Sequence, residues 1–158
     1  EWLQSPIVYK ELGNYTRLIK DLLPKYYSPG NCYYHYLHMA KGNFRDYLKG
    51  EEVWVKKYFY VLRPVLACRW IEKFNRPVPM EFELLLKETV DDKDLRIAIN
   101  ELLKRKRSGE ELDFAPRIPV ISEFIEAELN RLDQSKPGKT KLSDFSELNR
   151  VFRKIICN

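Results

Sequence analysis

The chain has 158 residues, a formal net charge of +5 at pH 7 and a pI near 9.0. Hydrophobic residues make up 44% and charged residues 32%, which excludes a disordered chain and is typical of one folded soluble domain. No apolar run approaches the roughly 20 residues that cross a bilayer, so we expect no membrane partner. The modest basic excess favours an anionic partner such as a nucleotide, RNA or DNA.

The cysteines Cys32, Cys68 and Cys157 lie far apart and form no CxxC pair. This spacing argues against a zinc ribbon or a redox motif and predicts free thiols in a reducing cytoplasm. The first residue is Glu1 rather than Met, from which we expect a fragment, a processed product or an excised domain.

Start signals and apolar spacing predict the first helices. Ser5-Pro6 is a typical helix start, and Asn14 is placed to cap a second helix that ends near Pro24. A long amphipathic helix is expected over residues 32–49, with Gly50 as its stop.

Residues 51–74 are apolar nearly all round, which predicts one long, buried, central helix. Pro64 is expected to kink this helix, because it lacks the N–H of a regular helical hydrogen bond. The β-branched residues would also permit strands, but the absence of a turn signal favours a helix.

The second half continues with helices. One is expected over residues 80–89, and another runs from a cap at Asp91 or Asp92 to about Arg107. Residues 110–116 are predicted to form a loop, and Pro119 is expected to begin the next helix.

Residues 134–141 are polar and basic and contain Pro and Gly, which predicts a flexible linker. Ser143 is expected to cap a last helix over residues 144–156. The fold class that follows is all-α, an irregular bundle of roughly six to eight helices around the long, kinked central one. We expect a helical domain at 1–133, and a basic linker plus final helix at 134–158.

The residues offer little catalytic chemistry. Asp91, Asp92 and Asp94 begin a helix, where carboxylates cap backbone N–H groups, so capping is favoured over a two-metal site. His35 and His38 lie one helical turn apart without a third ligand, which favours a polar or packing role over a metal site. No catalytic residue and no metal ligand is assigned.

A cationic stripe is the remaining candidate. On a helical wheel Lys56, Tyr60, Arg63 and Ala67 fall within about 60° of one another. Buried Lys and Arg are costly unless they are paired or bind a ligand. The stripe therefore binds an anion, forms internal salt bridges or faces solvent, and the residues alone leave these alternatives open.

Four blocks of the sequence carry a family resemblance: SPIVYKE, NCYYHYLHMAKGNFRDYL, KKYFYVLRPVLACRWI and PVPMEFE. They resemble the predicted nucleotidyltransferases of the DNA polymerase β superfamily that are associated with RNA ligases. The resemblance covers about residues 1–130, and the tail from Gln134 resembles nothing that we can place. In such proteins a catalytic α/β domain, with a Gly-Ser motif and an acidic pair that holds magnesium, precedes a helical domain.

Neither motif occurs here on a predicted strand, so the resemblance implies a C-terminal helical lobe that is inert alone. It implies that this lobe closes against the catalytic lobe of the same polypeptide and contributes to binding a nucleoside triphosphate. The residues implied for phosphate contact are Lys56, Tyr60, Arg63, Lys57 and Arg69. Those implied for contact with the base or acceptor are His35 and Trp70.

Magnesium and a nucleoside triphosphate are implied for the complete protein, and no cofactor for this chain. RNA and an RNA ligase are further implied partners. The alternatives are a stand-alone RNA-binding or partner-binding helical module and a purely structural bundle.

Overall fold

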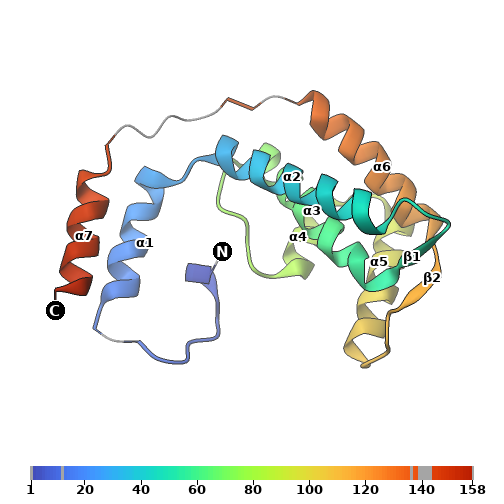
Figure 1. Ribbon diagram of the computed structural model, residues 1–158, viewed down its shortest axis with the longest axis horizontal. Helices are drawn as coiled ribbons and strands as arrows, with labels where there is room; N and C mark the ends of the chain where they lie inside the picture. Colours follow the sequence, from blue (N-terminus) through green and yellow to red (C-terminus); the bar gives the residue numbers. More distant parts are fainter. Residues whose placement is uncertain (1, 12, 136, 139–143, 158) are drawn as a thin grey trace.

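The computed structural model describes residues 2–11, 13–135, 137–138 and 144–157. Across these residues it contains seven α-helices, two short 3-10 helices (η) and a two-stranded antiparallel ribbon (Figure 1). The elements, in chain order, are η1 (Trp2–Gln4), α1 (Tyr15–Tyr26), α2 (Pro29–Tyr47), β1 (Glu52–Trp54), η2 (Val55–Lys57), α3 (Tyr58–Phe74), α4 (Phe82–Thr89), α5 (Lys93–Arg107), β2 (Phe114–Pro116), α6 (Pro119–Gln134) and α7 (Ser146–Ile156). The predicted all-α bundle is confirmed.

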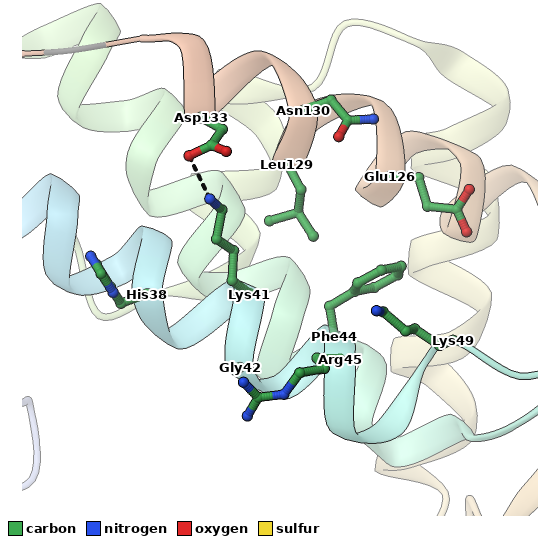
Figure 2. Close-up of a pocket in the computed structure, with 10 residues that line it drawn as sticks. All are labelled: His38, Lys41, Gly42, Phe44, Arg45, Lys49, Glu126, Leu129, Asn130 and Asp133. Carbon is green, nitrogen blue, oxygen red and sulfur yellow. Dashed lines mark hydrogen bonds and ion pairs between the residues drawn. The ribbon is translucent and has the colours of Figure 1, made fainter.

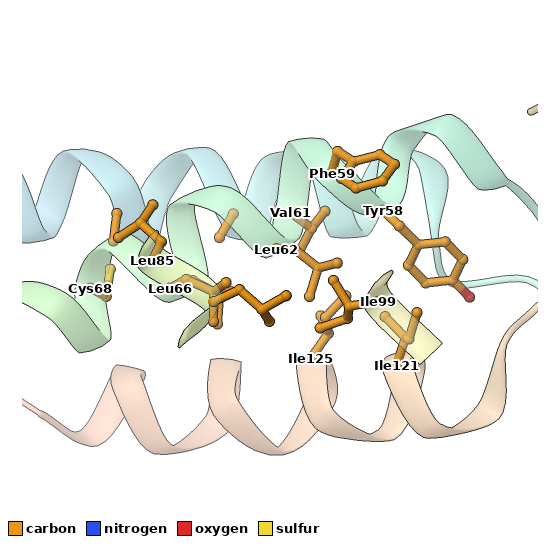
Figure 3. Close-up of a cluster of buried hydrophobic side chains, with 14 of the residues drawn as sticks. Tyr58, Phe59, Val61, Leu62, Leu66, Cys68, Leu85, Ile99, Ile121 and Ile125 are labelled. Carbon is orange, nitrogen blue, oxygen red and sulfur yellow. The ribbon is translucent and has the colours of Figure 1, made fainter. Parts of the chain in front are cut away.

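Helix α3 forms the centre of the core, as its apolar residues on every face predict. Its Val61, Leu62, Val65 and Leu66 are fully buried, and the helix packs against α2, α4 and α6 (Figure 3). Pro64 lies inside the helix and removes the hydrogen bond that the carbonyl of residue 60 would otherwise accept. The bend at this position stays a prediction.

Helices α2 and α3 run antiparallel. Near one end the thiol of Cys68 donates to the carbonyl oxygen of Tyr33, with Sγ and the oxygen 3.6 Å apart. Near the other end Lys57, just before α3, lies over the ring of Tyr47, the last residue of α2. The end of α2 and the start of α3 therefore meet beside β1 and β2, far from α1 and α7 (Figure 1).

The prediction of one helix over residues 51–74 is wrong in its first two turns. These residues form β1 and η2, and α3 begins only at Tyr58. The physical reason is a partner about 60 residues downstream: Val53 pairs with Ala115 and Trp54 with Phe114 in the β1–β2 ribbon. The loop expected at 110–116 accordingly contains β2.

The prediction of a helix that starts at Ser5-Pro6 is also wrong. Ser5 instead forms a local turn, in which the Ile7 N–H donates to Ser5 Oγ at 3.2 Å. Ile7 and Val8 remain largely exposed, so no apolar face stabilises a helix here.

The caps of the later helices agree with the sequence. The carboxylate of Asp92 accepts from the Leu95 N–H at 2.9 Å and starts α5, and Pro119 opens α6. This confirms the capping role of Asp92.

The final helix packs against the first one. Helices α1 and α7 lie side by side (Figure 1). The rings of Tyr26 and Phe145 stack with centroids 6.2 Å apart, and Lys25 Nζ lies 2.7 Å from a carboxylate oxygen of Glu147. Helix α7 begins at Ser146, two residues later than expected, and the proposed cap Ser143 lies outside the described residues, as does much of the predicted linker. The division at residue 133 stays a prediction. Among the described helices, none has the length and apolar character needed to cross a membrane.

Candidate functional site

Backbone hydrogen bonds fix η2, which leads into α3, to the two residues just before β2. The N–H groups of Val55 and Lys56 donate to the carbonyl oxygens of Asp113 and Leu112, both at 3.0 Å. Along this stretch buried and exposed residues alternate, with Val53 and Val55 inward and Trp54 and Lys56 outward. Short-range alternation of this kind is typical of a half-buried strand, and it presents Trp54 and Lys56 on one outer surface.

That surface consists of Trp54, Phe114 and Lys56. The rings of Trp54 and Phe114 meet edge to face, with centroids 5.5 Å apart and planes at 89°. Lys56 Nζ lies 4.6 Å from the centre of the Trp54 ring. Its nearest carboxylate contact is a long 3.8 Å approach to Asp113, and both side chains are at least half exposed, so that ion pair is weak.

We add to this surface a second cluster, in which Lys57, the next residue in the chain, lies between two tyrosines. Lys57 Nζ lies 4.1 Å from the ring centre of Tyr47 and 4.6 Å from that of Tyr60. We call the complete set, defined by exposed rings and lysines that lie against them, the aromatic–lysine surface: Tyr47, Trp54, Lys56, Lys57, Tyr60 and Phe114.

Arg63 lies one helical turn beyond Tyr60, but its side chain contacts a different part of the molecule. Its two terminal guanidinium nitrogens donate to the carbonyl oxygens of Met80 and Pro79, each at 3.0 Å. These bonds tie α3 to the segment that leads into α4. The phosphate contact implied for Arg63 therefore stays a prediction, beside a structural role that its geometry shows.

Arg69 lies about 13 Å further along α3 than Tyr60, at the helical rise of about 1.5 Å per residue. Its guanidinium is 3.0 Å from the carboxylate of Glu128, whose side chain is only 11% exposed. Arg131 also binds Glu128, at 2.9 Å, and reaches Glu72 at 2.7 Å. The hydrogen bonds that Arg131 donates to the carboxylates of Glu128 and Glu72 raise the pKa of its guanidinium. Arg69 thus belongs to a charge network that joins α3 to α6.

The two residues implied for base contact also lie away from the aromatic–lysine surface. Trp70 donates its indole N–H to the Pro77 carbonyl at 3.1 Å and packs on Phe74, with ring centroids 4.3 Å apart. His35 is exposed on α2, beside the ring of Tyr36 and about 18 Å along the helix from Tyr47. The structure does not bring His35 or Trp70 together with Lys56.

A groove of about 860 Å³ lies between α2 and α6 (Figure 2). Helix α2 supplies His38, Lys41 and Arg45 to it, whereas α6 supplies Glu126 and Asp133. Lys41 is paired with Asp133 across the groove, as Figure 2 shows. Because the two walls carry opposite charges, this groove suits a polyphosphate less well than the aromatic–lysine surface does.

Sequence reasoning found the lysines and Tyr60 but missed Tyr47, Trp54 and Phe114. The sequence predicts a helix for residues 53–55 and places Tyr47 inside another predicted helix, at 32–49. The available signal was the run of β-branched and aromatic residues from Val53 to Val55, residue types that favour strands. Within the described part of the chain, no group of three His, Cys, Asp or Glu side chains is arranged to hold a metal ion.

Residues 1–154 match RlaP, the RNA repair pathway DNA polymerase beta family. The chain belongs to this family. The match runs to residue 154, inside α7, so the expectation that the tail from Gln134 resembles nothing that we can place is corrected: most of the tail is part of the family sequence. Membership associates the chain with RNA repair and with the DNA polymerase β group of proteins.

A relative from Bacillus subtilis (strain 168), an uncharacterized protein called YcgL, is 47% identical over 153 residues. The match covers 96% of this chain and 59% of the relative, so the chain spans about three fifths of the length of this curated protein. No solved structure matches the chain.

Proposed function

We propose that this chain is the helical accessory lobe of a nucleotidyltransferase in RNA repair, and that it binds the nucleoside triphosphate through the aromatic–lysine surface. Family membership supports the link to RNA repair and to the polymerase β group. The catalytic lobe of the same polypeptide, and an RNA ligase acting on the same RNA, are partners within this proposal.

The observation that carries the proposal is the environment of the Lys57 ammonium group. Its ammonium group lies between two exposed rings, and among the described residues it has no carboxylate within ion-pair distance. Its neighbour Lys56 has only the long contact to Asp113. Ammonium groups on two consecutive residues, with little compensating charge, favour an anion at this place.

The rings beside these lysines suit the flat base of a nucleotide. A nucleoside triphosphate combines a flat base with a chain of phosphates, and the surface combines flat rings with point charges. Ammonium groups stabilise phosphoryl oxygens, and phosphoryl transfer depends mainly on positioning and electrostatic stabilisation. Lys56 and Lys57 would therefore act as phosphate ligands, and Tyr60 as a stacking surface that orients the base.

Magnesium is not assigned to this chain. Transfer enzymes of this kind hold the ion with carboxylates, and the described residues offer no such cluster. The ligands that the resemblance implies for magnesium would belong to the catalytic lobe.

The test is equilibrium binding of each ribonucleoside triphosphate to the chain and to the double variant Lys56→Ala/Lys57→Ala. We expect the variant to bind at least about tenfold more weakly, because each charge-assisted contact contributes about 1.5–3 kcal/mol. Lys20→Ala/Lys87→Ala is the matched control, since it removes two exposed lysines elsewhere on the molecule. Equal affinity of both double variants would refute the assignment.

A further inference from the structure

The aromatic–lysine surface exposes more ring area than one nucleotide uses. Tyr60 is 56% and Phe114 55% exposed, and Tyr47 and Trp54 follow at 37% and 38%. Clustered exposed aromatic side chains mark interaction sites, because a soluble domain normally buries such rings. A mononucleotide has a single base, which stacks on one ring or between two, so at least two rings would stay uncovered.

We infer that this surface binds a run of unpaired RNA nucleotides, with successive bases stacked on its rings and the backbone phosphates beside Lys56 and Lys57. The inference rests on the proposed function to the extent that both use the same two lysines. It adds a substrate class, a single-stranded RNA segment, that a triphosphate pocket does not require.

The arrangement of rings and charges fits such a segment. The rings come in two groups, Trp54 with Phe114 and Tyr47 with Tyr60. Each group holds one of two consecutive lysines, Lys56 in the first and Lys57 in the second. Platforms for single-stranded nucleic acid combine stacking rings with cations that follow the backbone. The aromatic–lysine surface contains both the rings and the cations.

The lysines now lie over the ring faces that bases would cover. Lys56 covers Trp54, and Lys57 lies between the two tyrosines. An exposed cation–π contact is weaker than the stacking of a base on the same ring. An incoming base would therefore displace the ammonium group, and the flexible lysine stem would carry it outward to the phosphate of that nucleotide.

Unpaired RNA is favoured over a duplex because the faces of paired bases are already stacked on their neighbours. A duplex would use the two lysines and leave the rings uncovered. The platform is also rigid, since the backbone of Val55 and Lys56 is hydrogen-bonded to residues 112 and 113 and Val53 pairs with Ala115. Preformed rings lose little conformational freedom on binding.

The experiment measures the affinity of the chain for an unpaired RNA of about eight nucleotides, a length within the site sizes of single-strand-binding folds. The same length in duplex form and a mononucleotide serve as comparisons. We expect the unpaired RNA to bind at least about tenfold more tightly than either. Its affinity should fall with rising salt, since two phosphates are neutralised.

Ring substitutions separate stacking from charge. Tyr60→Leu and Phe114→Leu should each weaken binding by roughly 5- to 100-fold, whereas Tyr60→Phe, which keeps the ring, should bind as the parent chain does. Phe152→Leu, at an equally exposed ring on α7, is the matched control and should change affinity by less than about twofold. Because Tyr60 and Phe114 lie on different elements, a variant that misfolds leaves the other informative.

Several results would overturn the inference. Equal binding of duplex and unpaired RNA, or unchanged affinity in both leucine variants, would show that the rings do not stack on bases. Self-association of the chain that Tyr60→Leu abolishes would assign the rings to a protein–protein contact instead.

The same measurements keep the two proposals apart. If mononucleotides bind through Lys56 and Lys57 but the longer RNA gains nothing, the RNA inference fails and the proposed function stands. If the RNA binds through the rings while no triphosphate binds at millimolar concentration, the proposed function fails and the RNA inference stands.

Discussion

At the scale of single residues, Arg63 shows why a cation in a stripe need not be a phosphate ligand. The sequence places it one turn from Tyr60, but its guanidinium donates to two backbone carbonyls. Charge-assisted hydrogen bonds contribute about 1.5–3 kcal/mol in folded proteins. We therefore predict that Arg63→Ala lowers the free energy of unfolding by about that amount and leaves nucleotide affinity nearly unchanged.

Melting and nucleotide titration on the same Arg63→Ala protein test this prediction. Arg107→Ala is the control: its guanidinium pairs with Glu83 at 2.6 Å, but both side chains are more than 60% exposed and contribute little. A stable Arg63→Ala protein with much weaker nucleotide binding would support the phosphate contact that the resemblance implies for Arg63.

Cys68 provides a second residue-scale prediction. It is fully buried, and this burial raises the pKa of its thiol to about 12. Only the thiolate reacts with disulfide reagents, so Cys68 should stay unlabelled in the native protein between pH 7 and 9, while the exposed Cys157 reacts. Labelling followed by peptide mapping checks this, with unfolded protein as the control in which every thiol reacts. Rapid native labelling of Cys68 would contradict the buried position.

At the scale of elements, a buried hydroxyl joins α3 to α6. Tyr58 accepts a hydrogen bond from the Ile118 N–H at 2.9 Å, and its hydroxyl lies 2.7 Å from Ser122 Oγ (Figure 3 shows this ring in the core). Tyr58→Phe would leave both partners buried or half-buried without the bond. We predict a loss of about 1–3 kcal/mol in the free energy of unfolding, measured by urea titration.

Tyr60→Phe is the matched control for Tyr58→Phe, since the same hydroxyl is removed two residues away on the exposed side of α3. Its stability should stay within about 0.5 kcal/mol of the parent chain. Equal stability of both variants would mean that the Tyr58 hydroxyl does not hold α6 in place.

The elements that sequence reasoning found are those with local signals. Asp92 and Pro119 start α5 and α6 through contacts within one turn, so both helices were predictable. Strand β1 was missed because its three residues are stabilised by β2, which follows some 60 residues later. For the same reason, the sequence predicts only part of the aromatic–lysine surface. Lys56 and Tyr60 are close in sequence, whereas Phe114 lies beside Trp54 only because the ribbon pairs them.

At the scale of the whole molecule, we propose that the lobe works with a catalytic partner. The described residues hold no metal-binding cluster, and the relative in Bacillus subtilis is longer than this chain. We predict that the chain alone transfers no nucleotide when it is incubated with labelled triphosphates, magnesium and RNA. Turnover that persists through repurification and is lost on mutation of a residue of this chain would contradict the accessory role.

Photo-crosslinking tests the central claim most directly, because it shows where on the molecule nucleotide and RNA lie. An unpaired RNA that carries 4-thiouridine, and separately a photoreactive triphosphate, would be crosslinked to the chain and the modified peptides sequenced. We predict crosslinks in the segments around Tyr47, Trp54 to Tyr60 and Phe114, which the Lys56→Ala/Lys57→Ala variant reduces strongly. Crosslinks confined to the α2–α6 groove or to the network around Arg69, and unaffected by that variant, would contradict the claim.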